Sequence, residues 1–146
     1  MQHTLPPDQQ RALRCLAETM IPPSEEFGVP SAGDDAIFAD IMRSFDRDAA
    51  HVATVLETLQ RLSGGSFADL DPARREAVAA QLRETGGAAL SYVSRIILQC
   101  YYRDDRVMRS LGMEARPPFP KGFEVPQGDW SLLDPVRRRP KLYRDA

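Results

Sequence analysis

The side chains that most often perform chemistry in proteins are sparse in this chain of 146 residues. It has two histidines, His3 and His51, and two cysteines, Cys15 and Cys100. None of the four has a second histidine or cysteine three or four residues away, which is the spacing that a helical metal site needs. We therefore expect no metal site and two free thiols. A single disulfide between Cys15 and Cys100 remains the alternative if the protein is exported.

His51 is the one histidine within a predicted helix, at the edge of an apolar stripe. A hydrogen-bonded structural role is commoner there than catalysis. An enzymatic alternative would pair His51 with Asp48 and a nearby carboxylate. The glycine turns SGGS and TGGA lack the strand-loop-helix context of a phosphate-binding loop. We expect no catalytic residue and no cofactor site in this chain, so it is predicted not to be an enzyme.

Charge is distributed unevenly along the sequence. Residues 1–115 hold 12 basic and 17 acidic residues, a net charge of −5, whereas residues 116–146 hold 7 and 4, a net charge of +3. The basic cluster is Arg137, Arg138 and Arg139, followed by Lys141 and Arg144. One basic run beside an acidic body is weak evidence for nucleic-acid binding. These arginines suit acidic residues of a protein partner better.

Apolar residues with helical spacing indicate an all-α protein: a compact bundle of five to six helices around a buried central helix. The central helix is expected over 88–102, which is the most hydrophobic stretch and is apolar almost all round. The others are expected over 7–21, 34–62, 72–84, and in a short stretch that starts at Asp104 or Asp105 and ends at Gly112. The span 34–62 is either one helix or two, with a break near Asp48 slightly favoured.

Several apolar residues outside the long helices are expected to pack onto the body. Phe27 and Val29 would pin the proline-rich loop 22–33, and Phe67 and Leu70 would plug the core before the helix at 72. Leu111 is expected to face inward from the short helix.

The last part of the chain differs from the helical body. We predict a helical body over 1–112 and an extended tail over 113–146, which contains six of the 12 prolines and shows no helical or strand period. Large apolar residues are spaced along this tail, unlike a disordered linker. It is expected to lie along another subunit, along its own helical body, or in solvent. For the first case, the partner-binding residues predicted are Phe119, Phe123, Trp130, Leu133, Arg137, Arg138 and Tyr143.

Three segments together resemble one family. The opening RALRCLAETMIPP, the central SYVSRIILQCYYRDDRVMRSLG and the continuation RPPFPKGFEVPQGDW are similar to the gluconate 2-dehydrogenase subunit 3 family, the small subunits of flavin-dependent dehydrogenases. This resemblance implies a non-catalytic helical subunit in a hetero-oligomer with a large flavin-dependent oxidoreductase of the glucose-methanol-choline type. That partner would hold the FAD and oxidise a sugar or an alcohol. Phe119, Phe123 and Trp130 are the positions carried over as partner contacts.

The sequence also gives expectations about the cellular location of the protein and about an alternative function. Members of that family commonly begin with a twin-arginine export leader, and this sequence begins without one. We therefore expect a cytoplasmic protein, or a periplasmic one if it is exported together with a partner that carries the signal. No stretch is apolar enough for membrane insertion. The alternative function is a stand-alone helical module that binds or regulates another protein, with its tail packed on itself.

Overall fold

The computed structural model describes residues 5–45 and 49–142. The structure is mostly helical, 64%, and the described residues contain no strand; one isolated antiparallel bridge joins Ser24 and Val29. The prediction of an all-α protein is confirmed. The chain divides into two units, Met1–Ala115 and Arg116–Ala146, and each is described by itself. His3, Asp48 and Tyr143 lie outside the described residues.

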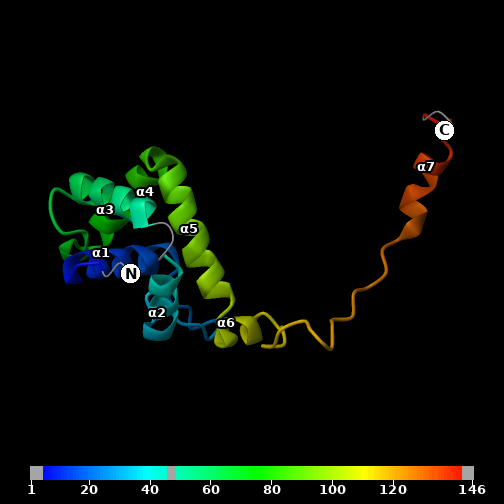
Figure 1. The fold of residues 1–146 in the computed structure, drawn as a ribbon, viewed down its shortest axis with the longest axis horizontal. Helices are drawn as coiled ribbons and strands as arrows, with labels where there is room; N and C mark the ends of the chain where they lie inside the picture. Colours follow the sequence, from blue (N-terminus) through cyan, green and yellow to red (C-terminus); the bar gives the residue numbers. More distant parts are fainter. Residues whose placement is uncertain (1–4, 46–48, 143–146) are drawn as a thin grey trace. The chain divides into compact units, whose positions relative to one another are not determined.

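Figure 1 shows the helices of the first unit, of which the first two are joined by the long loop 21–34. They are α1 Pro7–Met20, α2 Asp35–Ser44, α3 Ala49–Ser63, the 3-10 turn η1 Phe67–Asp69, α4 Pro72–Thr85, α5 Gly87–Tyr102 and α6 Asp105–Ser110. The predicted helices at 7–21, 72–84 and 88–102 are confirmed to within one residue at each end. The span 34–62 is two helices, as the favoured break predicted.

Aspartates begin three of these helices. The side chains of Asp34, Asp71 and Asp104 each accept a hydrogen bond from a backbone N–H two or three residues later, at 3.1, 3.0 and 2.9 Å. Such caps satisfy donors that have no partner within the helix. Pro7 and Pro72 occupy the first helical turn, where a missing N–H is tolerated. The cap of the short helix is Asp104 rather than Asp105.

The sharp junction between α4 and α5 depends on two glycines with different roles. Gly86 has an ordinary φ of −75°, but a Cβ placed there would lie 2.6 Å from Leu90 Cβ and 2.7 Å from the Leu82 carbonyl oxygen. Gly87 has a φ of +54°, the left-handed region that favours glycine. The first glycine permits close approach and the second permits the turn.

The core of the first unit is made by helices that lie far apart in the sequence. Helix α3 contacts α1, α4, α5 and η1, while α5 also contacts α2 and α6. The large side chains that are fully buried are Phe67, Leu13, Leu16, Ile37, Ile41, Leu59, Leu82, Ile97, Val52, Val55, Val93 and Val107. Phe67, at 1% exposure, is the predicted plug, and Leu70 packs against the same core.

Three expectations about burial are wrong. Helix α5 buries one face only, through Val93, Ile97, Cys100 and Tyr101, and leaves Leu98 and Tyr102 exposed. It is therefore not buried all round, because its neighbours cover a single side.

The other two exceptions are single side chains in connecting segments. Phe27 is exposed, and the loop is packed against the core by Val29 and by the fully buried Ala32 instead. Leu111 is exposed because it follows the last residue of the six-residue α6, where Gly112 at a φ of +72° turns the chain away.

The second unit contains helical structure that the sequence analysis did not predict. A 3-10 turn, η2 Trp130–Leu133, runs directly into the short helix α7 Asp134–Arg137. The expectation of a wholly irregular tail is therefore wrong for this stretch. No described residue from 116 to 142 is buried.

Candidate functional site

The predicted partner-binding side chains of the second unit present apolar surface to solvent. Phe119 is 84% exposed and Trp130 is 60% exposed, and Phe123 and Leu133 are exposed as well. Burying aromatic side chains of this size contributes strongly to binding when a partner covers them. The described part of the second unit therefore forms no core of its own, and the role of these side chains as partner contacts stays a prediction.

Trp130 and Leu133 are held close together by the helical segment. In a 3-10 turn, residues three apart lie directly above one another. The Asp129 carboxylate begins the turn by accepting hydrogen bonds from the backbone N–H of Ser131 at 3.0 Å and from its hydroxyl at 2.6 Å. These bonds lower the pKa of Asp129 below its ordinary value, because they favour the charged carboxylate. Local chemistry thus aligns the two apolar anchors.

The predicted arginines of the second unit differ in their partners. Arg137 forms an ion pair with Asp134, one helical turn earlier, at 3.4 Å. Arg138 is exposed and has no ion pair among the described residues. Tyr143 lies beyond the described range.

Phe123 is in a different environment from the other anchors. The Arg116 guanidinium lies over its ring, 4.3 Å from the centroid. The same guanidinium donates hydrogen bonds to the carbonyls of Gly122 at 2.8 Å and Pro117 at 3.2 Å. Phe123 and Arg116 therefore form a small local cluster, whereas Phe119 projects freely.

Three potentially reactive side chains of the first unit lie within the described residues: His51, Cys15 and Cys100. The His51 ring stacks on Tyr92, with centroids 4.9 Å apart. The proposed pairing of His51 with Asp48 falls outside the described residues. Cys15 and Cys100 are free thiols. Burial raises the pKa of both, which keeps them protonated and weakly nucleophilic.

Two arginines, one directly after α5 and one in α6, form ion pairs with aspartates of α2 and of its N-terminal cap. Arg103 donates to the carboxylate of Asp40 at 2.6 Å. Arg106 bridges Asp34 and Asp104, with contacts of 2.7 and 3.0 Å. Hydrogen bonds from Arg106 lower the pKa of both these carboxyl groups. The sequence analysis did not predict these ion pairs. Nothing in the residues around the two arginines indicated aspartate partners more than 60 positions away.

Comparisons with known proteins do not assign the chain to a family. No protein-family model, no curated protein and no solved structure matches it. Among the described residues, no helix has the length and apolar character needed to cross a membrane.

Proposed function

We propose that this protein is the non-catalytic small subunit of a hetero-oligomer with a large FAD-dependent oxidoreductase of the glucose-methanol-choline type, which acts on a sugar or an alcohol. Residues 1–115 act as a compact helical body and the proline-rich residues 116–146 as the partner-binding tail. The FAD belongs to the large subunit. The small subunit stabilises that protein, helps it to retain the flavin, or completes its substrate entrance.

One observation carries this proposal. The first unit builds its core from residues between Leu13 and Val107, so its folding needs no anchor from beyond residue 115. The second unit leaves its large apolar side chains exposed and buries none of its own described residues. Exposed apolar clusters of this kind are typical of surfaces that a partner covers. The resemblance of the three sequence segments supplies the class of partner.

The helical segment supports a specific mode of contact. A short helix that presents apolar anchors three or four residues apart is a recurring way to enter a groove on another protein. Trp130 and Leu133 would fill an apolar pocket on the flavoprotein, and Arg138 would meet a carboxylate at its rim. Tryptophan and arginine are the residues most enriched at such energetic centres.

Co-expression with the proteins encoded beside it tests the proposal by asking whether one of them is a flavoprotein that binds this chain. The two proteins should elute together as a yellow complex, and Trp130→Ala should weaken their affinity by roughly 30-fold to 1,000-fold. Phe27→Ala is the matched control, since it removes an exposed aromatic ring from the first unit and should leave the affinity unchanged.

Three results would contradict the proposal. The first is an affinity for the flavoprotein that Trp130→Ala leaves within two-fold of the original. The second is substrate turnover by the isolated chain. The third is a monomer that resists proteolysis across 116–140 and binds no flavoprotein, which would favour the stand-alone regulatory module.

A further inference from the structure

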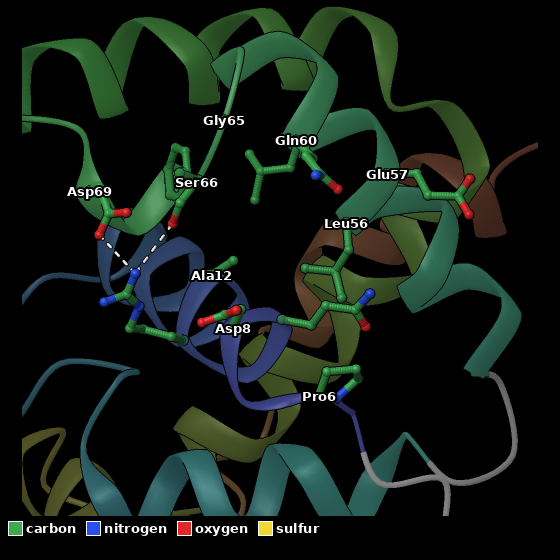
Figure 2. Close-up of a pocket in the computed structure, with 13 residues that line it drawn as sticks. Pro6, Asp8, Ala12, Leu56, Glu57, Gln60, Gly65, Ser66 and Asp69 are labelled. Carbon is green, nitrogen blue, oxygen red and sulfur yellow. Dashed lines mark hydrogen bonds and ion pairs between the residues drawn. The ribbon is translucent and has the colours of Figure 1, made fainter.

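The first unit has a pocket between α1, α3 and the loop that leads into η1, and its walls include Asp8 and Glu57 (Figure 2). Its large apolar residues Leu56, Leu59 and Phe67 are at most 5% exposed. The core already covers them, so they offer a ligand almost no surface. The outer side of α5 offers more apolar surface to another molecule.

Helix α5 lies at the edge of the first unit (Figure 1). Leu98 and Tyr102 on this helix are 41% and 53% exposed. Ser91 and Arg95, nearer the N-terminus of the helix, are exposed as well. Steps of four, three and four residues separate these positions, which places all four side chains along one face of the helix. We call this set the α5 stripe.

The spacing of the α5 stripe is that of a seam between two paired helices. In such seams, alternating steps of three and four residues bring side chains of one helix between those of the other. The helices of the first unit cover the opposite face of α5, through which Val93 and Ile97 are buried. The α5 stripe therefore favours another helix as its occupant.

The residues of the α5 stripe complement one another when a second copy of α5 lies antiparallel to the first. The midpoint of the stripe falls between residues 96 and 97. A two-fold axis through this point places Ser91 opposite Tyr102 of the other copy. The same axis places Arg95 opposite Leu98 of the other copy. A small side chain thus meets a large one at each end, which allows the helices to approach closely.

Arg95 and Tyr102 give this pairing its specific contact. Side chains on a helix tilt toward its N-terminus, so in antiparallel helices Arg95 of one copy and Tyr102 of the other lean toward each other. A guanidinium is attracted to the face of a tyrosine ring. Arg95 has no ion pair in the part of the chain that the structure describes, and it stays exposed although it contacts the Tyr92 ring at 5.2 Å. Its charge therefore suits the second ring.

The charges around the α5 stripe do not oppose the pairing. The two copies of Arg95 lie on opposite sides of the two-fold axis, and their side chains lean away from each other. Arg103, the next cation along α5, donates to the Asp40 carboxylate at 2.6 Å. Tyr102 also rests edge-on against the buried Tyr101, with ring centroids 5.2 Å apart. This contact orients the ring before binding, which lowers the entropy cost of pairing.

We propose that the α5 stripe is an interface between two copies of this chain, which pair antiparallel about a two-fold axis between residues 96 and 97. The same surface serves both copies, as in most symmetric dimers. One helix from each copy makes a small interface, so the dissociation constant is expected to be on the order of tens of micromolar. The pairing needs no other protein, so its test is independent of the flavoprotein partnership.

Sedimentation equilibrium of the full chain tests the proposal. Between about 1 and 500 µM, a range that brackets the expected dissociation constant, monomers should convert to dimers. Leu98→Gln and Tyr102→Ala should each weaken dimerisation roughly ten-fold or more, because two-fold symmetry removes each side chain twice. Phe27→Ala is the matched control, since it removes an exposed aromatic ring outside α5 and should leave dimerisation unchanged.

Three results of this experiment would overturn the proposal. The first is a monomer at every concentration, as expected if the chain's own tail or another protein covers α5. The second is a dimer that Leu98→Gln and Tyr102→Ala leave unchanged, which would place the contact elsewhere. The third is equal weakening by Phe27→Ala. All three residues are exposed, so the helix content of each variant by circular dichroism should match that of the original protein.

A mixture of two variants tests the antiparallel arrangement. Arg95→Ala and Tyr102→Ala each remove both Arg95–Tyr102 contacts from their own homodimers. In the mixed dimer one contact returns, because one chain supplies the arginine and the other the tyrosine. After correction for statistics, the mixed dimer should be about two- to five-fold tighter than the homodimers, the gain expected from one exposed cation–π contact. No gain in the mixture would overturn the antiparallel pairing.

Discussion

Within each of the two units of this protein, the interactions join residues at very different separations in the sequence. In the first unit, ion pairs and a shared core join residues far apart in the sequence: Arg106 and Asp34 are 72 positions apart. In the second, the bonds around Trp130 and Arg116 join residues at most six apart. Long-range packing gives a unit stability of its own, whereas isolated short helical turns are marginal in water. The comparison therefore places the core in the first unit, while contact with another molecule stays the role proposed for the second.

The largest effect on stability is expected at the plug of the first unit. Phe67→Ala removes a fully buried ring and leaves a cavity, which typically costs about 3 to 5 kcal/mol. Urea unfolding followed by circular dichroism measures the loss. Phe27→Ala, at an exposed phenylalanine, should change the free energy of unfolding by less than about 0.5 kcal/mol. Similar losses in both variants would contradict the assignment of the core.

The junction between α4 and α5 should be the next most sensitive point. Gly86→Ala forces a Cβ against Leu90 and the Leu82 carbonyl, and overpacking of this kind costs about 1 to 3 kcal/mol. Gly65→Ala is the matched control, because a Cβ there meets nothing within 4 Å. Thermal unfolding should separate the two variants clearly. Equal melting temperatures would show that the junction is looser than described.

The bridge from α6 to α2 should contribute about 1 kcal/mol, since its members are partly exposed. Arg106→Ala removes it. Arg109→Ala, which breaks an exposed pair within α6, should cost only about 0.3 to 0.5 kcal/mol. Denaturant unfolding at neutral pH distinguishes the two.

The same bridge gives the stability of the protein a dependence on pH. Arg106 lowers the folded-state pKa of Asp34 and Asp104 below the ordinary 3.8. Its contribution is therefore complete above the unfolded-state pKa and is lost as pH falls through the lower folded-state values. Unfolding measured from pH 5 downward should show a shallower decline in Arg106→Ala than in the original protein. Identical declines would exclude the bridge as the cause.

The smallest effect on stability is expected at Trp130, where substitution should have a large effect on partner binding. Trp130→Ala should change the free energy of unfolding by less than about 0.5 kcal/mol, because no described part of the second unit buries this ring. Calorimetry of the isolated chain checks this. A loss of several kcal/mol would place Trp130 in the protein's own fold and would remove the contrast between the units.

Local signals in the sequence were enough to place most helices. Asp71 followed by Pro72 marked the start of α4, and the glycine pair at 86–87 marked its end. The apolar period identified the buried face of α5, but it could not show how many sides neighbours would cover, so the expectation of a buried central helix is wrong at Leu98 and Tyr102. Coverage is a property of tertiary packing, which periodicity does not contain.

The sites were harder to predict than the helices. The tail residues stood out by composition, and the six of them that lie in the described range are exposed; their role as partner contacts stays a prediction. The turn at 130–137 was missed because only a few residues form it, around the cap at Asp129 and the proline at 135. The pocket between α1 and α3 was also missed, because Asp8 and Glu57 are 49 positions apart and ordinary in their local context.

The most direct measurement compares the full chain with a chain that ends at Ala115, by their affinity for the purified large subunit that we propose as the partner. The truncated chain keeps every core residue and should remain helical by circular dichroism. Its affinity should fall by more than about 100-fold, the loss expected when an interface loses its main anchors. Unchanged affinity, with both chains folded, would contradict the assignment of partner binding to the second unit.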